Sequence, residues 1–287
     1  MSFLSDAEIV INALEKYYQE SVSRQKPVIH QPPLETLISD LDLNTYITDG
    51  HLSGERLAQF LAKYLESTTR LLHPAYLAHQ VGTSHYAGAL ASLIDGFTNN
   101  PMAIYEMGPA ATSIEWTIIN WLLEKVGWLP QPLRAPKDTN PIFGGGVLTH
   151  GGSLANLTAL LAARSRTAPD AWQEGNPGNL VLLAPAESHY SISRAAGIMG
   201  LGCNAISPLA VDEQGVVIPD KLPGICARLK DEGKTVLAVV ANGCSTAAGL
   251  YDPIREIGEF CNAQQMWFHI DGAHGASALL SKMHKKR

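Results

Sequence analysis

The sequence predicts an α/β protein: a mostly parallel sheet with helices on both faces, preceded by a helical segment. From about residue 144 onward, short β-branched or leucine-rich runs alternate with stretches of helical periodicity, a pattern typical of a parallel sheet covered by its crossover helices. Before about residue 70, apolar residues instead recur at helical spacing. With 287 residues, of which 46% are hydrophobic, the chain can bury a substantial core. We therefore divide it into a helical N-terminal region, 1–105, and a larger domain, 106–287.

The individual elements follow from the same patterns. Amphipathic spacing predicts helices over 7–18 and 54–65, with a loop from 73 to 88. Thr112 and Glu115 have the spacing of a capping box ahead of an apolar helix over 116–126. The predicted strands cover 146–149, 180–183, 236–240 and 266–271, and the predicted helices between and after them cover 154–164, 191–199, 219–231 and 254–263. Segments 134–141 and 167–178, rich in Pro, Asn, Asp and Gly, are predicted surface loops.

Composition excludes several classes of partner. A net charge of −6, with no basic stripe except Lys285-Lys286-Arg287, argues against a nucleic-acid surface. The four cysteines lack metal-ligand spacing and are typical of reduced thiols, so we expect no metal site. No apolar run approaches the ~18 residues of a membrane span, and the N-terminus lacks the features of a signal peptide. We expect a cytoplasmic protein that binds neither membrane nor nucleic acid.

Asp271 ends the last predicted strand. The run Met266-Trp267-Phe268-His269-Ile270 is apolar and strand-like, and small residues follow the carboxylate. In open α/β sheets, ligands bind beyond the carboxyl ends of the strands. Asp271 is therefore well placed to meet a cationic ligand atom. The alternative is that it only caps the next turn, as short acidic side chains often do.

Gly151, Gly152 and Ser153 precede the helix predicted over 154–164. Helix N-termini present unpaired N–H groups and a partial positive charge, which suits a phosphate, and glycine allows close approach of the backbone. The spacing matches neither the dinucleotide-binding fingerprint nor the P-loop. The alternative is that Ser153 is an ordinary N-cap after a flexible turn.

Two further loops follow predicted strands. His189 comes after the strand over 180–183 and could lie flat on a planar ligand, while Ser191 caps the next helix; the alternative is a structural histidine. A small-residue loop containing Thr246 follows the strand over 236–240, and taken alone it is better explained as a plain tight connection. Together, an anion cradle, a flat imidazole, a small-residue wall and a carboxylate suit a ligand that is flat, phosphorylated and basic.

From about His73 to its end, the chain resembles the group II pyridoxal-phosphate-dependent amino-acid decarboxylases, which include the glutamate, aromatic amino-acid and diaminobutyrate enzymes. The segments that carry the resemblance are Ser188-His189-Tyr190-Ser191 with Arg194, where family members usually have Lys, and the runs 249–254 (Gly-Leu-Tyr-Asp-Pro-Ile) and 267–271 (Trp-Phe-His-Ile-Asp). Segments 73–80 and 105–109 are most similar to the bacterial diaminobutyrate or acidic amino-acid branch. The resemblance implies a fold-type-I large domain over 106–287 with pyridoxal 5'-phosphate as its cofactor.

The resemblance also implies roles for individual residues. Asp271 would pair with the pyridine nitrogen, since a nearby anion favours the protonated ring and that ring is the electron sink of the reaction. His189 would stack on the ring and help in proton transfer. Gly151, Gly152 and Ser153 would hold the phosphate, and Thr246 and Ala273 would line the ring. Gln80 would contact the substrate. The substrate would be an L-amino acid of the diaminobutyrate, glutamate or aspartate class, and the full-length form a homodimer.

One departure from the family concerns the lysine that binds the cofactor. In the family it stands in a His-Lys pair beyond this Asp and after another strand, whereas the present chain ends 16 residues past Asp271. His284-Lys285 lies in a polar segment that precedes the missing strand, so we do not take Lys282, Lys285 or Lys286 as the Schiff-base lysine. We expect a truncated chain that is inactive alone. Two alternatives are an aminotransferase-like or desulfurase-like enzyme of the same fold, and a non-catalytic cofactor-binding or interaction protein.

Overall fold

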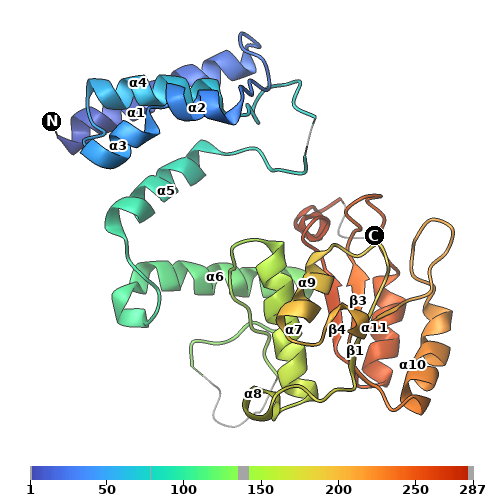
Figure 1. The fold of residues 1–287 in the computed structure, drawn as a ribbon. Coiled ribbons are helices and arrows are strands. Elements are labelled where there is room, and N and C mark those ends of the chain that lie inside the picture. The colour runs from blue at the N-terminus through green and yellow to red at the C-terminus, as the bar shows by residue number, and fades with distance from the viewer. Residues whose placement is uncertain (1, 78, 135–141, 284–287) are drawn as a thin grey trace. The chain divides into compact units, whose positions relative to one another are not determined.

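The computed structural model describes residues 2–77, 79–134 and 142–283 (Figure 1). The loop predicted over 134–141 therefore lies almost wholly outside the described residues, as do Lys285 and Lys286. Contacts divide the chain into two compact units, unit 1 (Met1–Pro101) and unit 2 (Met102–Arg287), which are described separately.

Unit 1 is helical. Its helices are α1 (Phe3–Val22), α2 (Leu34–Asp40), α3 (Leu43–Asp49), α4 (Glu55–Glu66) and α5 (Tyr86–Thr98). The helices predicted over 7–18 and 54–65 are confirmed as α1 and α4, which pack on each other. The buried Arg70 guanidinium fastens the segment after α4 to α1, since it donates to the Tyr17 carbonyl at 3.0 Å and pairs with Glu20 at 3.2 Å. The loop predicted over 73–88 is wrong at its end, because α5 begins at Tyr86 with the His85 ring accepting from the Ala87 N–H.

Unit 2 contains the sheet. Among its described residues the strands are β1 (Leu180–Ala184), β2 (Ile206–Pro208), β3 (Thr235–Asn242) and β4 (Phe268–Asp271), all parallel, in the order β2-β1-β3-β4. Its helices are α6 (Pro109–Val126), α7 (Gly152–Thr167), α8 (Ala171–Glu174), α9 (Ser191–Ile198), α10 (Leu222–Asp231) and α11 (Ile254–Ala263). Short 3-10 helices cover Tyr105–Met107, Cys203–Ala205, Pro219–Lys221 and Ala276–Leu280. The parallel sheet and the strands predicted at 180–183, 236–240 and 266–271 are confirmed.

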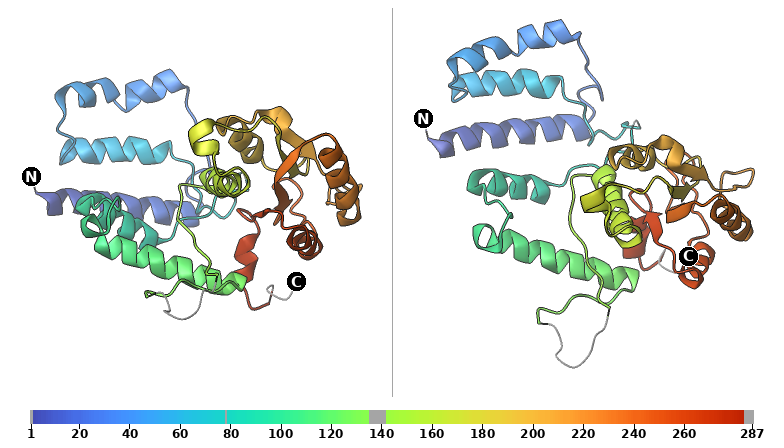
Figure 2. Two further views of the ribbon diagram at one scale, coloured as in Figure 1. Left: turned by 90° about the horizontal axis from the view of Figure 1, so that it is seen from below. Right: turned by 60° about the horizontal axis from the view of Figure 1, so that its bottom comes forward.

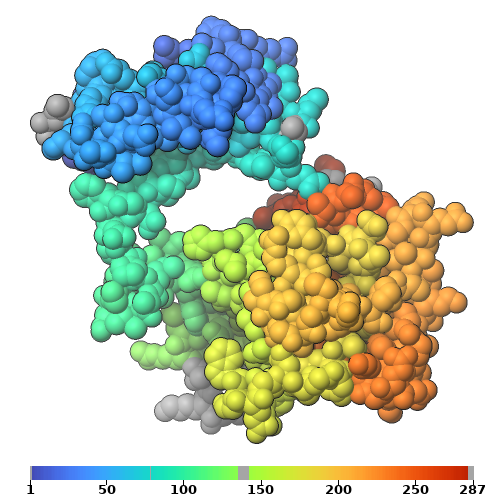
Figure 3. Space-filling model, viewed as in Figure 1, coloured from blue at the N-terminus to red at the C-terminus, as the bar shows by residue number. Residues whose placement is uncertain are grey.

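Helices cover both faces of this sheet, as predicted (Figures 1 and 2). Alternate strand residues point to opposite faces. In β1, Leu182 packs in one core cluster with α7 and α9, whereas Leu183 packs in a second cluster with α10 and α11. Both leucines are fully buried. The space-filling view shows the yellow and orange segments of unit 2 side by side on the surface (Figure 3).

The strand predicted over 146–149 is wrong. Val147 and Leu148 are exposed and pair with no strand, and the Leu148 N–H donates to the Glu115 carboxylate at 2.8 Å. The neighbouring glycine serves close packing on a helix, because a Cβ added at Gly146 would lie 3.0 Å from the Ile119 side chain of α6.

The capping box predicted at Thr112 is also wrong. Helix α6 begins at Pro109, so Thr112 already lies inside it. Proline favours the first helical position because its missing N–H has no partner there in any case. Strand β2 was not predicted because it is only three residues long. In the described part of the chain, no helix is both long and apolar enough to span a membrane.

Candidate active site

The loops after β3 and β4 are tied together at the carboxyl edge of the sheet. Asn242 and Asp271 pair as the last residues of their strands, and the Gly243 N–H donates to the Asp271 carbonyl at 2.8 Å. The Gly275 N–H donates to the Gly243 carbonyl at 3.1 Å. A Cβ at Gly275 would lie 2.6 Å from that same carbonyl oxygen, so glycine is required for the approach. The backbone around Asp271 is therefore held on two sides.

The Asp271 side chain is a buried carboxylate, 8% exposed. One oxygen, Oδ1, accepts from the Ala273 N–H at 3.2 Å, so the turn-capping alternative describes part of its bonding. The other, Oδ2, accepts from the Asn156 amide at 2.9 Å. No described lysine or arginine forms an ion pair with it. A carboxylate has about four acceptor positions, and buried charges are normally paired, so this one is suited to a further, cationic donor.

Asn156 is the site residue that sequence reasoning missed. It lies on α7, is 4% exposed, and donates to the Ser191 hydroxyl at 2.8 Å as well as to Asp271. Its Oδ1 lies 2.9 Å from the Nε2 of His269. The available signal was an amide side chain four residues after Gly152, on a helix whose neighbouring residues face an apolar core.

His269, on β4, is the third side chain that contacts Asn156. It is 8% exposed, and burial lowers its pKa from the usual 6.5, although the Asp271 carboxylate acts in the opposite direction. Burial disfavours the charged form of a histidine. His269 is therefore a neutral partner of Asn156 near neutral pH.

His189 follows β1 and belongs to the same polar cluster. Its Nδ1 lies 2.8 Å from the Ser191 hydroxyl and accepts from the Ser191 N–H at 3.2 Å. The expectation that Ser191 caps the next helix is wrong, because α9 begins at Ser191 and its N-cap is Tyr190. The Ser191 hydroxyl instead connects His189 to Asn156.

The glycine segment opens α7. Gly151 is the N-cap, with φ +92°, and the helix begins at Gly152 without a side-chain cap, so the alternative that Ser153 is the N-cap is wrong. The first N–H groups of an α-helix have no partner within the helix and favour anions. A Cβ at Gly152 would lie 3.0 Å from the Ala273 Cβ. The predicted phosphate cradle therefore lies directly against the loop that follows Asp271.

The remaining predicted residues differ in burial and in the unit to which they belong. Thr246 is half-buried in the loop after β3, and Ala273 is exposed. Gln80 is exposed and belongs to unit 1, so its contact with substrate stays a prediction. Lys282 is exposed near the end of the described chain. The described residues contain no group of three or more His, Cys, Asp or Glu that could hold a metal ion.

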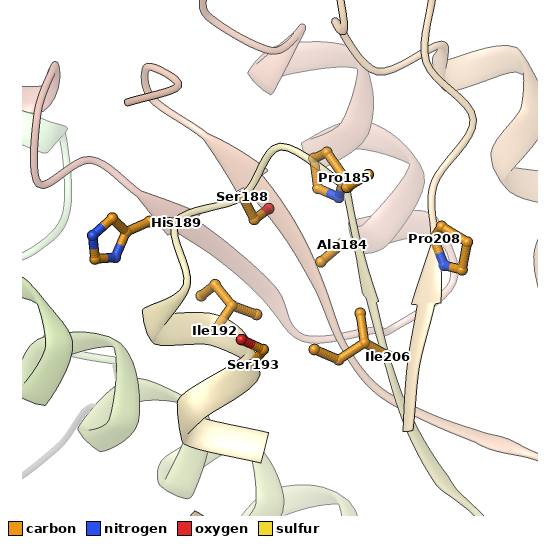
Figure 4. A pocket seen from close by; sticks show the side chains of 9 residues that line it. Ala184, Pro185, Ser188, His189, Ile192, Ser193, Ile206 and Pro208 are labelled. Carbon is orange, nitrogen blue, oxygen red and sulfur yellow. The ribbon is translucent and has the colours of Figure 1, made fainter. Parts of the chain in front are cut away.

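A pocket lies beyond β1 and β2, on one side of the loop that carries His189 (Figure 4). Ala184, Ile192 and Ile206 form its apolar lining, while the His189 ring points away from them. Asp271, at the end of β4, is not part of its lining. His189 thus both lines this pocket and belongs to the polar cluster around Asn156.

The fold is that of an α/β protein, and the polar residues at the carboxyl edge of its sheet suit a ligand with a cationic atom and an anionic group. A family model described as the pyridoxal-dependent decarboxylase conserved domain matches residues 49–287, and the chain belongs to this family. Pyridoxal phosphate is thus the cofactor of its family, as the sequence predicted.

Relatives agree with this assignment. The chain is similar to the acidic amino acid decarboxylase GADL1 of Xenopus tropicalis, with 31% identity over 99% of this chain and 53% of that protein. The crystal structure of mouse CSAD superposes with a TM-score of 0.82 at 25% identity, covering 99% of this chain and 58% of that one. The structure of Oryza sativa TDC with PLP, at 20% identity and a TM-score of 0.76, shares the fold and covers 98% and 59% of the two chains. The chain thus spans about half the length of these relatives, and its fold is that of the fold-type-I large domain.

Proposed function

We propose that the whole protein decarboxylates an L-amino acid with the aid of pyridoxal 5'-phosphate. The observation that carries this proposal is the buried Asp271 carboxylate. Its two hydrogen-bond donors, the Asn156 side-chain amide and the Ala273 backbone N–H, are both uncharged. Such a group fits a protonated pyridine nitrogen, which a neighbouring anion keeps protonated. When bound, the cofactor supplies the electron sink that takes up the electron pair left as CO2 departs.

Other residues of this chain support binding of the same cofactor. The start of α7 offers N–H groups for the phosphate at Gly152 and Ser153. In support, a Cβ built at Gly152 would lie 3.0 Å from the Cβ of Ala273, in the loop that follows Asp271. His189 would lie on the ring face, with Thr246 and Ala273 along its edge and Gln80 at the substrate. The whole protein would act as a homodimer.

We further propose an acidic amino acid, aspartate or glutamate, as the substrate class, with diaminobutyrate as the competing candidate. The support is the similarity to a relative named acidic amino acid decarboxylase, at 31% identity over 99% of this chain. The test is CO2 release by the whole protein from carboxyl-labelled aspartate, glutamate and diaminobutyrate, with and without added pyridoxal phosphate. Cofactor-dependent release from an acidic substrate supports the proposal. Release from none of the three would refute it.

A further inference from the structure

The buried Asn156 side chain joins the proposed partner of the pyridine nitrogen to the proposed ring-stacking residue. Its amide nitrogen donates to Asp271 at 2.9 Å and to the Ser191 hydroxyl at 2.8 Å. The Ser191 hydroxyl lies 2.8 Å from the Nδ1 of His189. These contacts connect α7, the end of β4 and the start of α9.

The chemistry of the groups fixes the direction of these hydrogen bonds. An ionised carboxylate only accepts, so the amide nitrogen of Asn156 must face Asp271. The Asn156 carbonyl then faces His269 at 2.9 Å, and His269 must donate from Nε2. Burial lowers the pKa of His269 and so favours its neutral form, which has a single ring proton. The contact with the Asn156 carbonyl requires that proton to be on Nε2.

The direction of the hydrogen bonds between Asn156, Ser191 and His189 follows in the same way. The Ser191 oxygen accepts the second amide hydrogen of Asn156, so its own proton is available for the Nδ1 of His189. The Ser191 backbone N–H also donates to that nitrogen, at 3.2 Å. With two donors directed at Nδ1, neutral His189 carries its proton on Nε2.

We propose that Asn156 is a positioning residue that orients the Asp271 carboxylate and, through Ser191, fixes His189 as the Nε2–H tautomer. The part that concerns the cofactor rests on the proposed function, because it requires Asp271 and His189 to meet pyridoxal phosphate. The hydrogen-bond chain itself is a property of the protein without cofactor. From a buried place on α7, Asn156 thus holds the Oδ2 of Asp271 and, through Ser191, determines which ring nitrogen of His189 carries the proton.

The first test reads the tautomer by NMR. In the whole protein, freed of cofactor and labelled with 15N-histidine, long-range proton–nitrogen correlations identify the protonated ring nitrogen, and His189→Gln assigns the signals. We expect the proton of His189 on Nε2. In Asn156→Asp, the new carboxylate accepts the Ser191 hydroxyl proton and turns it away from His189, so the Nδ1 signal of His189 should move.

The second test measures the dissociation constant of pyridoxal phosphate. Asn156→Leu removes both amide donors at similar volume, and Asn156→Asp places a second carboxylate beside Asp271. Each should weaken binding by about tenfold or more, as for loss of a charge-assisted hydrogen bond. Asn176→Ala is the matched control, because Asn176 also donates from unit 2, to the Met199 carbonyl at 2.5 Å, outside the network. It should lower the melting temperature while leaving the cofactor affinity and the His189 signals unchanged.

The two readouts separate two kinds of failure. A wild-type His189 with its proton on Nδ1, or Asn156 variants with wild-type affinity and unchanged His189 signals, would overturn the positioning role. A wild-type protein with the Nε2–H tautomer that binds no pyridoxal phosphate would instead overturn the proposed function, and with it the role of Asn156 toward the cofactor.

Discussion

Replacing Asp271 by Asn removes the charge at the centre of the site and keeps the shape of the side chain. The carboxylate is 8% exposed and receives hydrogen bonds from Asn156 and Ala273, which an amide oxygen can accept in part. Loss of a hydrogen bond to a charged partner corresponds to roughly 1.5–3 kcal/mol. We therefore expect the dissociation constant of pyridoxal phosphate to rise about 10- to 150-fold, and decarboxylation to fall further, because the protonated ring matters most where negative charge develops.

The assay is a fluorescence titration of Asp271→Asn and wild type with pyridoxal phosphate, together with the rate of CO2 release at saturating cofactor. Asp252→Asn is the matched control. Asp252 is also a buried carboxylate at this sheet edge, 5% exposed, but it accepts from the backbone N–H groups of Val217 at 3.0 Å and Asn242 at 2.7 Å. Its variant should lose stability and keep its cofactor affinity. Equal affinity of Asp271→Asn and wild type, or an equal loss in both variants, would refute the pairing of Asp271 with the cofactor.

Four further outcomes are expected. Ser153→Ala should weaken pyridoxal phosphate binding by about 1–2 kcal/mol, five- to thirtyfold, in the same titration; an unchanged constant would leave the phosphate to the backbone alone. Burial holds the pKa of His269 below 6.5, so the folded protein binds fewer protons than the unfolded chain just below that pH. The free energy of unfolding should therefore fall as the pH drops through about 6.5, by up to ~1.4 kcal/mol per pH unit, and His269→Gln should flatten this dependence in urea titrations. Burial raises the pKa of the Cys261 thiol to about 11, so iodoacetamide should label the exposed Cys203 first and Cys261 only after unfolding, as read by mass spectrometry. A polypeptide of residues 1–287 should bind pyridoxal phosphate without a covalent link, and lysine labelling after borohydride reduction would contradict that expectation.

The sequence predicted those parts of the fold that local patterns determine. The apolar runs at β1 and β3 form buried strands because their residues pack against helices on both faces, whereas in β4 Phe268 is partly buried and Ile270 is exposed. The run over 146–149 looked similar, but it pairs with no strand among the described residues, and Gly146 packs on α6. Strand formation depends on a partner, which a single segment does not specify.

The candidate site, like the fold, could be predicted from the sequence only in part. The positions of Asp271 and His189 at the sheet edge could be predicted, because Asp271 ends one strand and His189 follows another, and parallel strands bring their carboxyl ends to one edge. Asn156 could not, because its bond to Asp271 spans 115 positions in the sequence. A buried amide on a helix is recognisable as part of a site only when the groups that satisfy it are known.

The two carboxylates at this edge show why burial alone does not identify a ligand site. The side chain of Asp252 accepts from the backbone of Val217 and Asn242, so its charge joins segments of the fold. Asp271 accepts one turn N–H, but its second partner is the Asn156 side chain, which also contacts His269 and Ser191. Side chains held this way keep their atoms in fixed directions toward a bound group, as a preorganised site requires. This difference in partners, rather than in exposure, is the reason we propose a structural role for Asp252 and a cofactor-binding role for Asp271.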